Sequence, residues 1–264
     1  ADWVRYLQDG KVFQYSTSNI KAAARFRSHA DSKAEMIFNK LMLKAIALPA
    51  GGVLSPKGYD LYDFQKNFGV PHILGGNKTY IAHQPGLGKS AQSICAVNSK
   101  WGRTLIVVPS FLRITWAREI TKWSIKDFPS IAVVPVSTKQ ALTNWDADFV
   151  IVPDSMIAKP WVQAGLLKQN FRYVFVDEGH RFKTPDASRT VALFGGKTKK
   201  IKSPGLIYRA EHVCMLSGTP LLNRPIELWP VLFAMAPELI DFMSYQDFGF
   251  HFGGRFVGFR FDRL

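Results

Sequence analysis

A glycine loop followed by a lysine and a serine contains the residue types in this 264-residue sequence that most directly suggest chemistry. The loop reads Gly86, Leu87, Gly88, Lys89 and Ser90. It comes after a predicted strand, Thr79–Ala82, and before a helical run, Ala91–Asn98. Glycines there let backbone N–H groups face phosphate oxygens, and the helix start adds partial positive charge. Lys89 would reach the β- and γ-phosphates of ATP and Ser90 would ligate Mg²⁺, although His83 replaces the first glycine of the general pattern.

An acidic pair further along the chain is the second candidate for chemistry. Residues 171–176 form a mostly apolar run that predicts a buried strand, and Asp177 and Glu178 follow it directly. A parallel strand would deliver both carboxylates to the sheet edge that holds the phosphate loop. Asp177 is then placed to hold Mg²⁺, and Glu178 to orient and deprotonate an attacking water. Two solvated acids after a strand are the alternative, and the phosphate loop upstream favours the catalytic interpretation.

The elements that must position these residues follow from the alternation of short β-rich runs with helical segments. This alternation predicts an α/β fold, in which a mostly parallel sheet carries helices on both faces. The predicted strands are Thr79–Ala82, Thr104–Val108, Ile131–Val136, Phe149–Val152, Tyr173–Val176 and His212–Leu216. Ligands of such sheets bind outside the carboxyl ends of the strands, where the two motifs fall.

The first 58 residues have a different pattern. Val12–Tyr15 predicts a short strand, and helical periodicity runs over Ile20–Phe26 and Ala34–Ile46. We expect residues 1–58 to form a small N-terminal accessory segment, and no chemistry can be assigned to it.

The net charge of +14 and the isoelectric point near 9.8 indicate a polyanionic partner. Lys and Arg side chains that displace condensed counterions supply the sequence-independent part of nucleic-acid affinity, which does not distinguish DNA from RNA. The densest cluster of charge follows Gly195 and Gly196 and is predicted to be an exposed loop. Its lysines are Lys197, Lys199, Lys200 and Lys202.

Two cysteines, Cys95 and Cys214, sit in apolar runs without Cys or His at metal-ligand spacing. They predict buried, inert thiols rather than a zinc site or a disulfide. No run approaches the roughly 18 apolar residues of a membrane span, and the chain start lacks the order of a secretory signal. We therefore expect a cytoplasmic or nuclear protein. The chain begins without Met and stops at Leu264 without an obvious terminator, which suggests a fragment.

Together these residues resemble the superfamily-two helicases, and within them the Swi/Snf-type translocases, over roughly Tyr59 to Gly254. In that family the leading glycine of the phosphate loop is commonly absent, which accounts for His83. The run Leu61–Gln65 with Gly69 and Val70 resembles the adenine-recognising glutamine motif, and implies that Gln65 hydrogen-bonds the adenine edge. The resemblance implies a RecA-like ATP-binding lobe over residues 59–236, and the start of an inter-lobe or C-terminal element over residues 237–264.

The run Thr104–Ser110, with Trp116 and Trp123 downstream, resembles motif Ia of this family. Both tryptophans fall near helical spacing with Leu112 and Ile120, which predicts core packing rather than base stacking. Ser110 lies where a strand leads into a helix. It could hold a nucleic-acid phosphate, or it could simply cap the helix.

Two further motifs carry the resemblance. The run Asp177–Lys183 with Ser188 resembles the extended second motif, with Gly179 in place of the commoner alanine, and Leu216–Pro220 resembles the third motif. The resemblance implies that Ser217 and Thr219 link the nucleotide state to the nucleic-acid site through His180. Together with Arg224–Leu228 and Phe248-Gly249, the third motif is closest to the HARP-type annealing helicases and their microbial or viral relatives.

The resemblance implies the ATP-binding lobe of a DNA translocase or annealing helicase, which couples ATP hydrolysis to movement on duplex or forked DNA. A second RecA-like lobe, in the same longer chain or in a partner, would supply the arginine finger, because nothing after Pro220 resembles its motifs. The alternatives are the first lobe of an RNA helicase and a non-hydrolysing nucleic-acid-binding module. The aromatic and basic run Phe248–Phe256 could be a nucleic-acid surface or part of an inter-lobe element.

Overall fold

The computed structural model describes residues 3–8, 11–16, 52–137, 143–221, 223–240, 244–251, 254–257 and 260–263. The chain divides into two compact units, residues 1–45 and residues 46–264. The first unit contains an antiparallel hairpin of β1 (Trp3–Gln8) and β2 (Lys11–Ser16), and β2 includes the predicted strand Val12–Tyr15. The predicted helices Ile20–Phe26 and Ala34–Ile46 lie outside the described residues.

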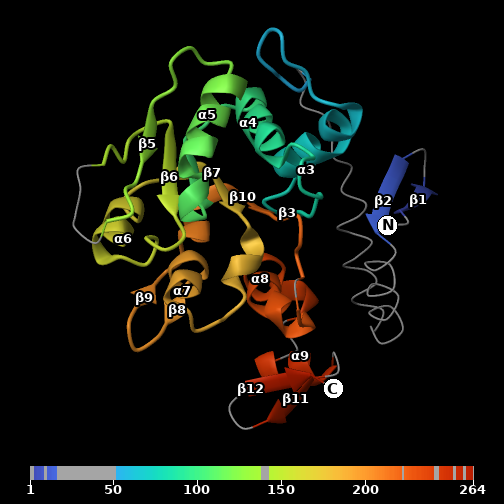
Figure 1. Ribbon diagram of the computed structural model, residues 1–264, viewed down its shortest axis with the longest axis vertical. Helices are drawn as coiled ribbons and strands as arrows, with labels where there is room; N and C mark the ends of the chain where they lie inside the picture. The colour runs from blue at the N-terminus through green and yellow to red at the C-terminus, as the bar shows by residue number, and fades with distance from the viewer. Residues whose placement is uncertain are drawn as a thin grey trace. The chain divides into compact units, whose positions relative to one another are not determined.

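The second unit is built on a six-stranded sheet in which every strand pair is parallel, with the order β3-β10-β7-β4-β6-β5 (Figure 1). Its strands are β3 (Lys78–Ile81), β4 (Thr104–Val108), β5 (Ile131–Val133), β6 (Phe149–Pro153), β7 (Phe171–Asp177) and β10 (Ala210–Leu216). The predicted α/β fold is therefore confirmed. The strand predicted over Ile131–Val136 ends at Val133. Val134 still donates to the Ile151 carbonyl, but Pro135 has no N–H with which to continue the ladder.

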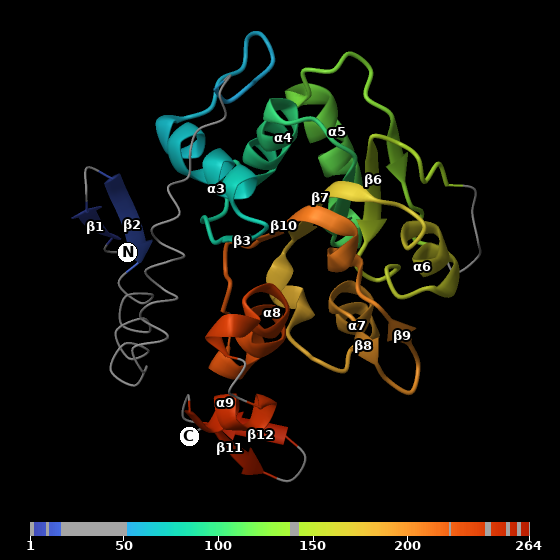
Figure 2. The same cartoon turned by 180° about the vertical axis from the view of Figure 1, so that it is seen from behind.

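Helices cover both faces of the sheet, as Figures 1 and 2 show. Alternate strand residues point to opposite sides, so Leu105 and Val107 join one buried cluster while Ile106 and Val108 join the other. The helices α3 (Val70–Gly75), α4 (Lys89–Ser99) and α5 (Arg113–Trp123) pack into one cluster. The helices α6 (Pro160–Leu166), α7 (Ser188–Phe194) and α8 (Trp229–Met235) pack into the other.

Shorter elements connect this framework. They are η1 (Gln65–Gly69), η2 (Ser110–Leu112), η3 (Gly179–Phe182), the strands β8 (Gly196–Lys197) and β9 (Lys202–Ser203), η4 (Leu206–Arg209), η5 (Pro225–Leu228), η6 (Pro237–Leu239), α9 (Tyr245–His251), β11 (Gly254–Val257) and β12 (Arg260–Arg263). Within the described parts of the chain, no helix has both the length and the apolar character that a membrane crossing needs.

Both cysteines are free and buried, as the sequence predicts. Burial raises the pKa of the Cys95 thiol to about 12, and it raises the pKa of Cys214 as well. In the aromatic and basic run, Phe248 is buried and Phe250 is half-exposed, whereas the side chains from His251 onward lie outside the described residues.

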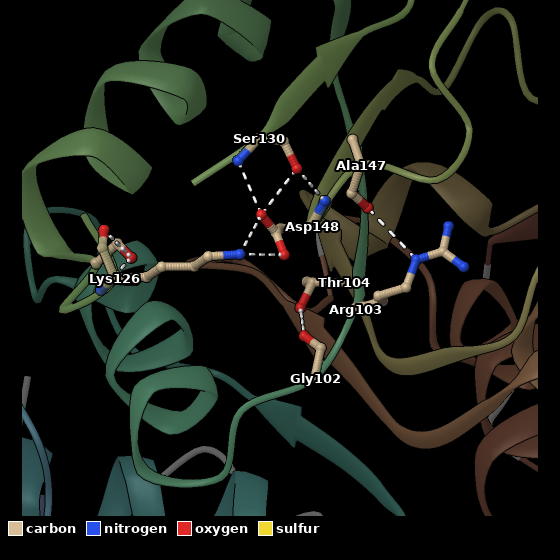
Figure 3. Close-up of polar contacts among 8 residues, drawn as sticks. Gly102, Arg103, Thr104, Lys126, Ser130, Ala147 and Asp148 are labelled. Carbon is tan, nitrogen blue, oxygen red and sulfur yellow. Dashed lines mark hydrogen bonds and ion pairs between the residues drawn. The ribbon is translucent and has the colours of Figure 1, made fainter. Parts of the chain in front are cut away.

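A polar clamp holds the amino edge of the sheet (Figure 3). The Asp148 carboxylate accepts hydrogen bonds from Lys126 Nζ and from the amide and hydroxyl of Ser130, each at 2.8 Å. Partial burial opposes ionisation of Asp148, but these donors outweigh burial and hold the pKa of its carboxyl below the ordinary value. Beside them, Arg103 Nε donates to the Ala147 carbonyl at 3.5 Å. The clamp fixes the starts of β4, β5 and β6, at the edge opposite the predicted motifs.

Candidate nucleotide-binding site

Three neighbouring strand ends bring the predicted motifs together. In the sheet register, Leu216 of β10 pairs with Ile81 of β3 on one side and with Asp177 of β7 on the other. The Ser217 amide donates to the Ile81 carbonyl at 3.2 Å, which extends this pairing by one residue. The phosphate loop, the acidic pair and the third motif therefore leave the sheet along one line at its carboxyl edge.

The phosphate loop turns on two glycines in the left-handed region. Gly86 has φ = 84°, and Gly88, with φ = 66°, caps the start of α4. Residues with a side chain rarely adopt these angles, which explains the glycines. Lys89 Nζ donates to the carbonyls of His83 at 2.8 Å and Gln84 at 3.2 Å. The Lys89 side chain therefore folds back over its own loop and hydrogen-bonds to the loop backbone.

Gln65 is buried and joins the segment before α3 to the phosphate loop. Its Oε1 accepts from the Tyr62 amide at 2.8 Å, and its Nε2 donates to the Leu87 carbonyl at 3.1 Å. The Leu87 carbonyl also accepts from Gln92 Nε2 at 2.8 Å. A Cβ on Gly88 would lie 2.5 Å from Gln65 Nε2, so the loop and the amide are in close contact. Recognition of adenine by Gln65 stays a prediction, and the structure places the residue beside the loop.

The acidic pair lies next to the loop lysine. Partial burial lowers the pKa of the Lys89 ammonium, while the carboxylates of Asp177 and Glu178 act to raise it. Ser90 lies in the first turn of α4, directly after Lys89. Asp177 is fixed from α5, because Trp116 Nε1 donates to its Oδ2 at 2.8 Å. The catalytic residues predicted from sequence are thus gathered at one place.

Trp116 is buried, at 2% exposure, as predicted for a core residue. Trp123 is partly buried against the same core. The contact between the Trp116 indole and Asp177 was not predicted, because helical spacing shows which face of α5 is buried but not which polar atom the indole N–H meets.

A hydrogen-bonded chain leads from Glu178 to the third motif. Glu178 has φ = 50°, a left-handed conformation that is uncommon for a residue with a side chain and that often occurs at functional sites. His180 Nδ1 lies 3.2 Å from Glu178 Oε2 and 2.9 Å from Ser217 Oγ, and the Thr219 amide donates to Ser217 Oγ at 3.2 Å. Burial lowers the pKa of His180, and Glu178 acts to raise it. Of the three residues that the resemblance assigns to coupling, Ser217 therefore contacts both His180 and Thr219.

Ser110 lies at the end of β4 as the first residue of η2. Its hydroxyl caps neither η2 nor α5, so the capping interpretation is not supported. Ser110 Oγ instead lies 3.0 Å from Ser155 Oγ, two residues after the end of the neighbouring strand β6, and this contact is exposed on the surface. The pair presents two hydroxyls at the carboxyl edge, and a phosphate contact at Ser110 stays a prediction.

Comparison with known proteins identifies the family. Residues 75–253 match the family described as the SNF2-related domain, a range that begins after Gln65. The chain belongs to the SNF2-related family. The predicted Swi/Snf-type resemblance is therefore confirmed.

Among the relatives of this SNF2-related chain is the SWI/SNF-related matrix-associated actin-dependent regulator of chromatin subfamily A-like protein 1 of Bos taurus. It is 33% identical over 184 residues, which cover 69% of this chain and 18% of that protein. The DNA annealing helicase and endonuclease ZRANB3 of Homo sapiens is 31% identical over 185 residues, 67% of this chain and 16% of that protein. The chain thus spans under a fifth of the length of these relatives.

A solved structure supports the fold of the SNF2-related chain. The Sulfolobus solfataricus SWI2/SNF2 ATPase core in complex with dsDNA matches with a TM-score of 0.55 at 21% identity. The match covers 77% of this chain and 40% of that one. At this identity the likeness shows the fold alone.

Two glycines of the predicted motifs sit where a side chain would meet a neighbour. A Cβ on Gly179 would lie 2.9 Å from Met215 Cε, so Met215 occupies the space that a side chain at this position would need. A Cβ on Gly218 would lie 2.7 Å from Pro85 Cδ. The third motif therefore packs directly on the phosphate loop.

A buried acid that sequence-based prediction missed forms ion pairs with the segment predicted to be the extended second motif. Asp154 follows β6 and is 1% exposed. Its Oδ2 lies 2.5 Å from Arg181 Nε and 3.4 Å from Arg189 Nη1. The sequence did contain a signal for it, because Asp154 follows a predicted buried strand just as the acidic pair Asp177 and Glu178 does. Asp154 thereby anchors the turn after Glu178.

Another ion pair joins two segments that are far apart in sequence. Lys183 Nζ lies 3.2 Å from Glu227 Oε1, and Arg224 Nε lies 3.6 Å from the same oxygen. The Glu227 side chain is 9% exposed. The extended second motif is therefore tied to the segment after the third motif.

Proposed function

We propose that this chain is the ATP-binding lobe of a DNA-dependent ATPase, of the translocase or annealing-helicase type, that couples ATP hydrolysis to movement on duplex DNA. The observation that carries the proposal is the alignment of the phosphate loop, the acidic pair and the third motif along one sheet edge. Membership of the SNF2-related family and the printed names of the relatives support it.

The loop and the carboxylates fit ATP with Mg²⁺. A Cβ on Gly86 would meet nothing within 4 Å, so the backbone there leaves room for phosphate oxygens. Among the described residues no group of three or more His, Cys, Asp or Glu could hold a metal alone. Magnesium typically binds through one or two carboxylates plus substrate phosphates, and Asp177 with the Ser90 hydroxyl matches that need. When bound, Mg²⁺ would neutralise charge on the phosphate oxygens.

Different residues of the chain would bind the nucleotide and activate the attacking water. Lys89 would exchange its carbonyl partners for the β- and γ-phosphate oxygens, and Gln65 would receive the adenine edge. Glu178 would take the proton of the attacking water on its carboxylate as that water adds to the γ-phosphorus and the bond to the β-phosphate oxygen breaks. Trp116 would hold the Asp177 carboxylate in place.

Coupling to DNA would run through the contacts between the second and third motifs. A shift of Glu178 during ATP hydrolysis would move His180, and His180 would in turn move Ser217 and Thr219 through their hydrogen bonds. Ser110 would contact a DNA phosphate at the same sheet edge. A second RecA-like lobe would supply the arginine that stabilises charge on the γ-phosphate. We place the activity in the cytoplasm or nucleus, where DNA is present.

ATPase stimulation by defined nucleic acids tests the proposal. Turnover of the protein together with its second lobe is measured with duplex DNA, forked DNA, single-stranded DNA and RNA at equal phosphate concentration. We expect duplex or forked DNA to stimulate turnover most. Preferential stimulation by RNA would establish the RNA-helicase alternative instead, and ATP binding without turnover on any nucleic acid would establish the non-hydrolysing module.

A further inference from the structure

The hairpin of β8 and β9 concentrates positive charge away from the nucleotide site. Its lysines are Lys197, Lys199, Lys200 and Lys202, and all four are exposed. Residues 187–210 contain six Lys and Arg residues and no Asp or Glu. Among the described residues, none of the four lysines forms a salt bridge. The charge of the hairpin is therefore not neutralised within the described structure.

The hairpin register makes this charge unfavourable. Lys197 and Lys202 are directly paired across the two strands. Like charges in opposite positions destabilise an antiparallel pair. Lys199 and Lys200 in the turn add to the repulsion. A solvent-exposed loop that served only as a connection would gain stability from a single acidic residue here, and residues 187–210 have none.

The base of the hairpin is nevertheless tied to the surrounding structure by several contacts. The buried Ser203 hydroxyl lies 3.0 Å from Gln163 Oε1 of α6 and accepts from the Gly205 amide at 3.1 Å. A Cβ on Gly205, where φ = 92°, would lie 2.7 Å from the Gly195 amide nitrogen, so the two ends of the hairpin touch backbone to backbone. The side chain of Ile201 packs against the core. The lysines are thus presented from a fixed base.

The turn is fixed as well. The Thr198 amide donates to the Ile201 carbonyl at 2.7 Å, and the Thr198 hydroxyl accepts from the amides of Lys200 and Ile201 at 3.2 Å each. Both views show the hairpin beside α7, on the face of the sheet opposite α4 (Figures 1 and 2). It is therefore separate from the phosphate loop.

We infer that the β8–β9 hairpin is a contact for the sugar-phosphate backbone of DNA, distinct from the strand-end motifs. This inference rests on the proposed function, since it assigns a further part of the same DNA-binding surface. Four ammonium groups on one short hairpin suit a ligand that carries several closely spaced negative charges. A single phosphate or carboxylate group could not pair with all four lysines. A DNA backbone has one charge per nucleotide and requires no base recognition from lysine. Its binding relieves the repulsion between Lys197 and Lys202.

The salt dependence of DNA binding tests the inference. Each lysine that neutralises a phosphate contributes about 0.9 to the slope of log affinity against log salt. At 0.1 M salt this contribution makes binding about eightfold tighter than at 1 M salt. The variant with Lys197, Lys199, Lys200 and Lys202 all changed to Gln should show a slope shallower by about 2–4. Its affinity for duplex DNA at 0.1 M salt should fall about 60-fold or more.

The matched control removes the same charge elsewhere. Lys57, Lys100, Arg118 and Lys168 are exposed and lie outside the hairpin, and the control changes these four to Gln. We expect its slope to change far less. An equal change in both variants would assign the effect to overall charge and overturn the inference, and so would an unchanged slope in the hairpin variant.

Stability supplies a second, independent readout. Lys197→Glu replaces a repulsive cross-strand pair with an attractive one, so it should raise the thermal midpoint while lowering DNA affinity. A lower midpoint with unchanged DNA affinity would give Lys197 a structural role and overturn the inference. If the wild-type chain binds no DNA at any salt concentration, the proposed function fails too. Wild-type binding with an unaffected hairpin variant removes only the hairpin from the DNA surface.

Discussion

Replacement of Trp116 by Phe would remove one hydrogen bond from the candidate metal site while keeping an aromatic ring in the core. The indole Nε1 of Trp116 lies 2.8 Å from Asp177 Oδ2, and the Asp177 Oδ1 accepts the Glu178 amide at 3.0 Å. These two donors orient the carboxylate. Phe at this position leaves Asp177 with the backbone donor alone, so its carboxylate gains freedom to rotate.

The expected magnitude follows from the contact and its surroundings. A hydrogen bond to a charged group contributes about 1.5–3 kcal/mol. Asp177 is only partly buried, so water can replace the lost donor and the lower value applies. A loss of about 1.4 kcal/mol is tenfold in affinity, which agrees with the roughly 10–100-fold effects seen when partners of metal ligands are removed. We expect Trp116→Phe to weaken Mg²⁺-dependent nucleotide binding about tenfold.

Titration of a fluorescent ADP analogue at a series of Mg²⁺ concentrations measures this effect. Binding without Mg²⁺ should be unchanged, because Lys89 and the loop are untouched. Trp123→Phe is the control, since Trp123 lies on the same helix α5 in partly buried packing. Thermal unfolding of both variants reports the loss of packing. If folded Trp116→Phe protein keeps the Mg²⁺ dependence of the wild type, the indole serves packing alone and the reasoning is refuted.

Four further predictions follow from the site and the fold. Lys89→Ala should abolish measurable Mg-ATP binding or turnover with little change in thermal midpoint, and a folded variant that still turns over ATP would remove Lys89 from the phosphate site. Glu178→Gln should bind nucleotide but hydrolyse it about 10²–10⁴-fold more slowly, and normal single-turnover rates would exclude it as the base. The 264-residue chain alone should hydrolyse ATP very slowly with little stimulation by duplex DNA, because an arginine finger typically contributes about 10³–10⁵ in rate; equal steady-state turnover with and without a second lobe would show that these residues contain the catalytic arginine. Asp148→Asn should lower the free energy of unfolding in urea by about 1–2 kcal/mol at pH 7. Since the folded pKa of Asp148 is depressed, this difference should be present above the unfolded pKa and vanish as the pH falls through the folded pKa, and a pH-independent difference would contradict the role of the ionised carboxylate.

The amino-acid sequence by itself determined the positions of the six strands of the main sheet, the phosphate loop and the acidic pair. These features depend on local rules, since glycine is needed where φ is positive, as at Gly86 and Gly88, and a run of buried apolar residues predicts a strand such as β7. The end of β5 was predicted wrongly: the sequence prediction ran the strand on to Val136, although proline lacks an N–H and the strand ends before Pro135. Family membership also rests on residue types in a fixed order.

Only the tertiary structure decided which of these elements touch. The sheet order places β10 between β3 and β7, so Leu216 aligns residues that lie far apart in the chain. The hydrogen bond between Trp116 and Asp177 joins residues that are 61 positions apart in the sequence. Periodicity predicts which face of a helix is buried, but the polar atom that meets a buried indole depends on how helix and sheet pack. In the same way, the lysines of the hairpin were visible in the sequence, and only the strand register showed that Lys197 faces Lys202.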